Sequence, residues 1–98
     1  MTKEQYLLLN LMEECAEVAK VASKASRFGV QHENPELQMS NEELLVGEYY
    51  DLCAMFQMLI DAGIIHQPSS DVSMRLVSEK KYKVQRMMEY SRQLGRLE

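Results

Sequence analysis

Two clusters of carboxylates are the residues of this sequence whose types and spacing could do chemistry. One lies in MEECAEVAK and the other in VGEYYDL, and their members are Glu13, Glu14, Glu17, Glu48 and Asp51. Both segments have helical patterning, so Glu14 and Glu17 project from one side of their helix, as do Glu48 and Asp51. Because like charges at this spacing repel, each pair needs something that compensates its charge.

The carboxylate pairs also fall on or beside the apolar faces of their helices. The two predicted apolar arcs consist of Leu7, Leu8, Leu11, Cys15, Val18, Ala22 and Ala25, and of Leu44, Leu45, Leu52, Met55, Leu59 and Ala62. We therefore expect both pairs to face the core or its rim, where an uncompensated carboxylate costs several kcal/mol. A hard divalent cation bound by carboxylate oxygens, Mg²⁺ or else Mn²⁺, would compensate them.

Length and composition indicate one small helical domain that self-associates. The 98 residues suit a single domain over 1–98, and an apolar content of 46% is high for so small a core. We expect an all-α fold, an antiparallel bundle of three to four helices that a homo-oligomer, a dimer or a tetramer, completes.

Charge and hydropathy exclude several classes of partner. A net charge of −4 argues against a nucleic-acid polymer or an anionic membrane as the partner. No apolar run approaches the roughly 20 residues that cross a bilayer, so we expect a soluble, cytoplasmic protein. Cys15 and Cys53 are interpreted as small core residues in a reducing compartment.

Capping and turn residues set the predicted elements. Thr2 and Gln5 form a capping box that begins a helix over about 2–27, and Gly29 ends it. Residues 29–40 are predicted to be a loop. A second helix begins at Ser40 or Asn41 and ends at about 62, and a third spans about 70–94.

The last helix carries most of the basic residues, which are Lys80, Lys81, Lys83, Arg86, Arg92 and Arg96. Lys80 and Lys83 project within its apolar arc of Val72, Leu76, Val84, Met87, Tyr90 and Leu94. They could neutralise the carboxylates or reach phosphates, or equally be structural side chains at the rim of the helix.

The spaced EExxE and ExxD motifs resemble the signature of the all-α nucleoside triphosphate pyrophosphohydrolases. The segments KASRFG, NEELLVGEYYDLCAMFQML and KYKVQRMMEYSRQLG are similar to the short MazG-like proteins of that superfamily. The resemblance implies Mg²⁺-dependent cleavage of a (deoxy)nucleoside triphosphate between its α- and β-phosphates, giving a monophosphate and pyrophosphate. It also implies that Glu14, Glu17, Glu48 and Asp51 ligate the metal and that Glu13, beside Glu14, orients or deprotonates the attacking water.

Candidate phosphate contacts follow from charge rather than from the motif. They are Lys24, Arg27, Lys80 and Lys83, although Arg27 could instead only interact with the dipole of its helix. Two alternatives stay open. One is a phosphoribosyl-ATP pyrophosphohydrolase of the same superfamily, and the other is a non-catalytic helical module whose acidic clusters bind a basic partner.

Overall fold

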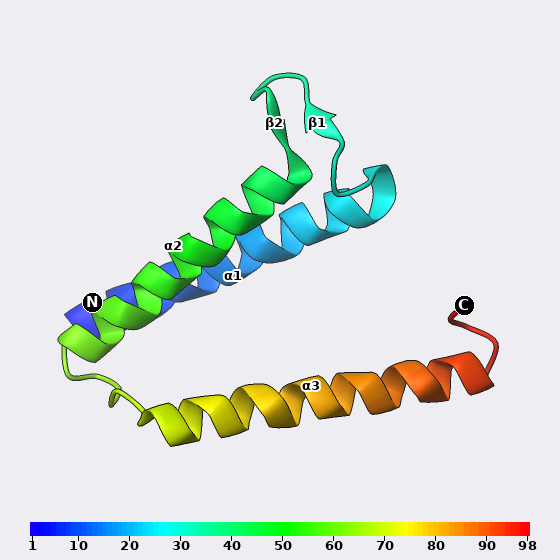
Figure 1. The fold of residues 1–98 in the computed structure, drawn as a ribbon. Helices are drawn as coiled ribbons and strands as arrows, with labels where there is room; N and C mark the ends of the chain where they lie inside the picture. The colour runs from blue at the N-terminus through cyan, green and yellow to red at the C-terminus, as the bar shows by residue number, and fades with distance from the viewer. The chain divides into compact units, whose positions relative to one another are not determined.

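The computed structural model describes all 98 residues, and about 72% of them are helical. The elements in chain order are α1 (Lys3–Phe28), β1 (Glu33–Asn34), β2 (Met39–Ser40), α2 (Asn41–Asp61) and α3 (Ser70–Gln93) (Figure 1). The predicted mostly helical fold is therefore confirmed. The chain divides into two compact units, residues 1–66 and 67–98, and each is described by itself.

The capping box that begins α1 is confirmed. The Thr2 hydroxyl accepts a hydrogen bond from the main-chain N–H of Gln5 at 3.1 Å, and the Gln5 side chain accepts one from the Thr2 N–H at 2.9 Å. Two donors that the helix would otherwise leave unpaired are thus satisfied. The helix ends at Phe28, one residue later than predicted, and the predicted Gly29 caps it with a φ of 101°, in a region that favours glycine.

The segment between α1 and α2 is more ordered than predicted. A loop was expected over 29–40, but its two short strands pair antiparallel, with Glu33 opposite Ser40 and Asn34 opposite Met39. The Asn34 side chain accepts hydrogen bonds from the N–H groups of Glu36 and Leu37, which forms the tight turn. Two-residue strands are too short to give a periodic pattern, so the sequence shows only the turn.

The beginning of α2 is held by its own cap and by a contact to α1. Ser40 is the cap, and it exchanges hydrogen bonds with Glu43 in a second capping box. Asn41, the alternative cap in the sequence, is instead buried at 3% exposure, and its amide donates to the carbonyl of Gly29 at 2.9 Å. The first residue of α2 is therefore tied to the end of α1.

Helices α1 and α2 lie side by side as an antiparallel pair, called here the helical hairpin (Figure 1). Their contacting face, the seam, repeats at alternating intervals of four and three residues. It consists of Leu7, Leu11, Glu14, Val18, Val21 and Ala25 from α1 and of Asn41, Leu45, Glu48, Leu52, Met55 and Leu59 from α2, all buried or half-buried. This is the repeat of a coiled coil. The most buried apolar residues are Leu7, Val21 and Leu59.

Part of the predicted core is wrong. Leu8, Cys15 and Ala22 of the first arc are exposed, and so is Ala62 of the second. Val21, which lies outside the predicted arc, is instead a core residue. The predicted arc was too wide because α1 carries two apolar stripes, and only one of them faces α2.

Helix α3 begins at the cap Ser69, whose hydroxyl accepts from the N–H of Val72 at 3.2 Å, and Gly95 follows it with a φ of 74°. Both ends agree with the prediction to within one residue. No residue of α3 is buried, so its whole apolar arc is exposed. None of the three helices combines the length and apolar content needed to cross a membrane.

The bond from Asn41 to Gly29 predicts a specific loss of stability. Asn41→Asp keeps the size of the side chain but replaces the donating amide with a carboxylate that faces a carbonyl oxygen. We expect a loss of about 1–3 kcal/mol in the free energy of unfolding, measured by urea denaturation. Asn10→Asp is the matched control, because Asn10 also donates to a carbonyl, that of Tyr6, but in an exposed position. An equal loss in the two variants would contradict the assignment.

Candidate metal centre

Two carboxylates occupy the middle of the seam. Glu14 takes the third of six seam positions in α1 and Glu48 the third of six in α2, and both side chains are half-buried. Asp51 lies one turn beyond Glu48 and is exposed. One carboxylate oxygen from each of Glu14, Glu48 and Asp51 can lie within 4.8 Å of the others. These three residues are called the acidic group.

The surroundings of Glu48 raise its proton affinity. The pKa of Glu48 is raised above its ordinary value of 4.5, first by burial and then by the charges of Asp51, Glu14 and Glu17. The ammonium of Lys20 acts in the opposite direction. Glu48 therefore carries its negative charge at a cost, because its surroundings repel that charge more than they stabilise it.

Within residues 1–66, no side chain forms an ion pair with this group. The two ion pairs of the chain are Arg75 with Glu79 and Arg92 with Glu89, and both lie in α3. Three carboxylates from two helices, converging without an ion-pair partner in residues 1–66, form a set of oxygen donors that could hold a metal ion. Carboxylate oxygens suit hard cations such as Mg²⁺, which keeps several waters and needs only a few protein ligands.

The remaining predicted acidic residues lie outside this group. Glu17 is exposed one turn after Glu14, although its charge still reaches Glu48. Glu13 is also exposed. Of the carboxylates predicted to face the core or its rim, only Glu14 and Glu48 are half-buried. The assignments of Glu17 as a metal ligand and of Glu13 as a catalytic acid stay predictions.

The predicted basic residues of α1 lie well along the helix from the acidic group. At about 1.5 Å rise per residue, Lys24 is about 15 Å and Arg27 about 20 Å along the axis from Glu14. Lys24 is half-buried, and the guanidinium carbon of Arg27 lies 5.4 Å from the ring centroid of Phe28. The structure therefore gives Arg27 a stacking partner, and phosphate contacts by either residue stay predictions.

Lys20 is the functional candidate that the sequence analysis missed. It lies one turn after Glu17, and its charge counters those that raise the pKa of Glu48. Its spacing of three residues from Glu17 on the same helix was the available signal. Lys20 is the basic side chain of α1 whose charge lowers the pKa of Glu48.

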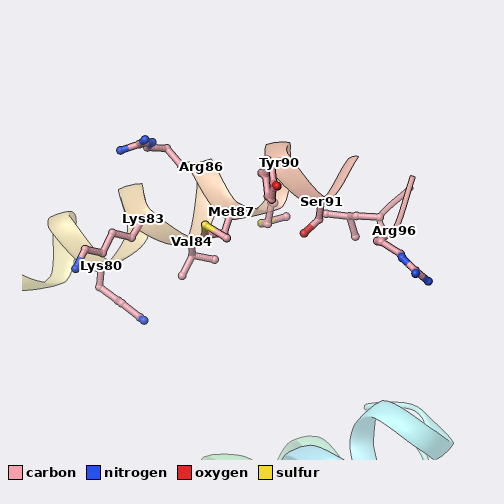
Figure 2. Close-up of a pocket in the computed structure, with 10 residues that line it drawn as sticks. Lys80, Lys83, Val84, Arg86, Met87, Tyr90, Ser91 and Arg96 are labelled. Atoms are coloured by element: carbon pink, nitrogen blue, oxygen red, sulfur yellow. The ribbon is translucent and has the colours of Figure 1, made fainter. Parts of the chain in front are cut away.

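Lys80 and Lys83 belong to the other compact unit. They line a shallow hollow on α3 together with apolar side chains such as Val84 and Met87 and with Arg96 of the terminal segment (Figure 2). Within α3 neither lysine forms an ion pair. Their proposed contacts with phosphate stay predictions.

Comparison of the chain with protein-family models, with curated proteins and with solved structures found no match. The findings therefore describe a small, mostly helical protein with three helices and an acidic group, and they identify no family. Any function must be argued from the residues of the helical hairpin themselves.

The raised pKa of Glu48 predicts how stability depends on pH. Between its ordinary pKa and its raised pKa, the folded protein binds a proton that the unfolded chain releases, so ionisation of Glu48 destabilises the fold as pH rises. Glu48→Gln should therefore raise the melting temperature of the metal-free protein at neutral pH. The gain should vanish at about pH 3, where Glu48 is protonated in both states. Glu13→Gln is the control. An equal gain in its melting temperature would show that removing any negative charge has this effect, whatever its position.

Metal binding predicts a second change in thermal stability. At a Mg²⁺ or Mn²⁺ concentration 100 times the dissociation constant, binding should stabilise the fold by about 2.7 kcal/mol, or roughly 10 °C or more in melting temperature. Glu48→Gln and Asp51→Asn should remove most of this shift, while Glu13→Gln should keep it. If the wild-type protein has the same melting temperature with added metal and with chelator, the acidic group is not a metal site.

Proposed function

We propose that the protein is a Mg²⁺-dependent nucleoside triphosphate pyrophosphohydrolase that releases a nucleoside monophosphate and pyrophosphate. The observation that carries the proposal is the convergence of Glu14, Glu48 and Asp51 from two helices without an ion-pair partner in residues 1–66. A divalent cation supplies the missing positive charge, and a metal bound by few protein ligands keeps positions for phosphate oxygens and water.

The residues of the hairpin then have distinct tasks. Glu14, Glu48 and Asp51 would hold the cation, with Glu17 as an outer member whose charge acts on the same site. When bound, Mg²⁺ polarises the phosphoryl group and lowers the pKa of its water. Glu13, the acid next to Glu14 in the chain, is proposed to orient that water or accept its proton. No covalent nucleophile is required.

A polyphosphate substrate fits the electrostatics of this arrangement. The helical hairpin repels anions unless a metal is bound, so the substrate is expected to enter with its Mg²⁺. Lys20 is about 9 Å along the axis from Glu14, at about 1.5 Å per residue, which is nearer than Lys24 or Arg27. We therefore add Lys20 to the candidate phosphate contacts. The similarity of the EExxE and ExxD motifs to pyrophosphohydrolases supports the same reaction.

A pair of aspartate variants tests the proposal. Asp51→Asn should lower the rate of pyrophosphate release from (deoxy)nucleoside triphosphates roughly 100-fold or more, because it removes a charged ligand. Asp61→Asn makes the same chemical change in the same helix, at an exposed residue hydrogen-bonded to Gln57 at 2.8 Å, and should keep the wild-type rate. The measurement is pyrophosphate release with Mg²⁺ and then with chelator.

The possible outcomes separate the proposed reaction from its alternatives. Full activity in Asp51→Asn would contradict the metal site. Metal-dependent release of pyrophosphate from phosphoribosyl-ATP, with none from a panel of nucleoside triphosphates, would identify the protein as a phosphoribosyl-ATP pyrophosphohydrolase instead. Silence on every substrate at high enzyme concentration would favour the non-catalytic interaction module.

A further inference from the structure

A line of chemically distinct side chains runs along α1 beside the seam. Each of its members directly precedes a seam residue, and they are Tyr6, Asn10, Glu13, Glu17, Lys20 and Lys24. In chain order the line presents an aromatic ring, an amide, two carboxylates and two ammonium groups. It is called here the polar line of α1.

The polar line lies on the same side of the helical hairpin as Asp51. Asp51 also directly precedes a seam residue, Leu52, and one step back along a helix is a rotation of about 100°. In an antiparallel pair this rotation turns the residues of both helices to one side of the seam. The charges of Glu17 and Lys20 act on Glu48, which agrees with this arrangement.

Charge divides the helical hairpin at the acidic group. Residues 5–12 of α1 and 52–60 of α2 contain no charged side chain. Because the two helices are antiparallel, these segments lie at the same end of the hairpin (Figure 1). Toward the other end the polar line carries Lys20 and Lys24, and they lean back toward the acidic group because Cα–Cβ bonds tilt toward the start of a helix. A ligand held at the acidic group therefore meets an uncharged surface in one direction and cations in the other.

Tyr6 is the one phenylalanine or tyrosine of the helical hairpin that lies on this side near the acidic group. Tyr49 and Phe56 directly follow seam residues, which turns them to the opposite side. Tyr50 faces away from the seam, and Phe28 lies at the other end of α1. The Tyr6 side chain is 59% exposed, so its ring is available for stacking.

Asn10 lies between Tyr6 and the acidic group. Its amide donates a hydrogen bond to the carbonyl of Tyr6 at 3.2 Å, and within residues 1–66 its side-chain oxygen accepts none. An amide offers both an acceptor and donors, which suits the polar edge of a nucleobase. At about 1.5 Å per residue, Asn10 is about 6 Å and Tyr6 about 12 Å along the axis from Glu14. A ribose and base attached to a metal-bound phosphate span a comparable distance.

We infer that a nucleoside triphosphate binds along the polar line in one direction, with its base against Tyr6 and Asn10 and its terminal phosphates toward Lys20 and Lys24. The inference rests on the proposed function, since the metal at the acidic group holds the phosphates between these two ends. Tyr6 provides a ring on which any base can stack. The two ammonium groups stabilise the charge of the pyrophosphate as it leaves.

Nucleotides that cannot be cleaved test this direction without turnover. The probes are the α,β-imido analogues of the four common deoxynucleoside triphosphates and inorganic tripolyphosphate, which has no base, each titrated calorimetrically with Mg²⁺. Tyr6→Ala should weaken binding of the tightest analogue roughly 10-fold or more, because stacking is lost, and leave that of tripolyphosphate unchanged. Tyr50→Ala, at a similarly exposed tyrosine (65%), should change neither. Equal losses in the two variants would overturn the inference.

Two further substitutions test the ends of the polar line. Asn10→Ala should weaken the analogue about 5-fold or more, because a hydrogen bond to the base is lost. Gln57→Ala removes an exposed amide at the same end, one that donates to Asp61, and should have no effect. Lys24→Gln should weaken the analogue and tripolyphosphate by the same factor, since it contacts only phosphate. If Tyr6→Ala weakens tripolyphosphate and Lys24→Gln weakens only the analogue, the substrate binds in the reverse direction and the inference is wrong.

Failure of this inference and failure of the proposed reaction give different results. If Tyr6→Ala binds every analogue as the wild type does, while the wild type releases pyrophosphate, the inference fails and the reaction stands. If binding of an analogue depends on Tyr6 but the corresponding triphosphate is not cleaved, the inference stands and the reaction fails. A wild-type protein that binds none of the probes would overturn the inference.

Discussion

The structure depends on one unfavourable feature, a pair of carboxylates in the middle of a coiled-coil seam. Glu14 and Glu48 take positions that the repeat otherwise fills with Leu, Val, Met and Ala, apart from Asn41 at the start of α2. Burial, and then repulsion from Asp51, Glu14 and Glu17, raise the pKa of Glu48. The apolar contacts of Leu7, Val21 and Leu59 toward the two ends of the seam hold the helices together in spite of it. A fold that maintains such a cost does so most simply for a cation.

The rest of the helical hairpin fixes the position of these carboxylates along the seam. Two capping boxes begin the helices at fixed residues, and the short β-hairpin sets how far the chain travels before α2 begins. Asn41 then joins the first turn of α2 to the end of α1. A slip of one residue along either helix would rotate Glu14 or Glu48 out of the seam by about 100°. The contacts that end the helices therefore also place the acidic group.

The sequence predicted the helix ends well, because Thr2, Ser40 and Gly29 act through local hydrogen bonds and backbone conformation. Of the four carboxylates that it predicted to converge, Glu14, Glu48 and Asp51 do so, while Glu17 lies outside the group. It assigned the core less well, since Leu8, Cys15 and Ala22 form an apolar stripe that looks like part of the seam until the partner helix is placed. Lys20 was missed because its effect on Glu48 acts between helices. The pairing of α1 with α2 is the information that residue spacing alone does not contain.

Paramagnetic broadening by Mn²⁺ in the amide NMR spectrum tests the central claim, that the acidic group holds a divalent cation, most directly. At substoichiometric Mn²⁺, the signals around Glu14, Glu48 and Asp51 should broaden first, and excess Mg²⁺ should restore them. Asp51→Asn should abolish the effect at the same metal concentration. Broadening that begins at other acidic residues, such as Glu33, Glu36 and Asp61, or that spreads evenly over the acidic surface, would contradict a metal site in the seam.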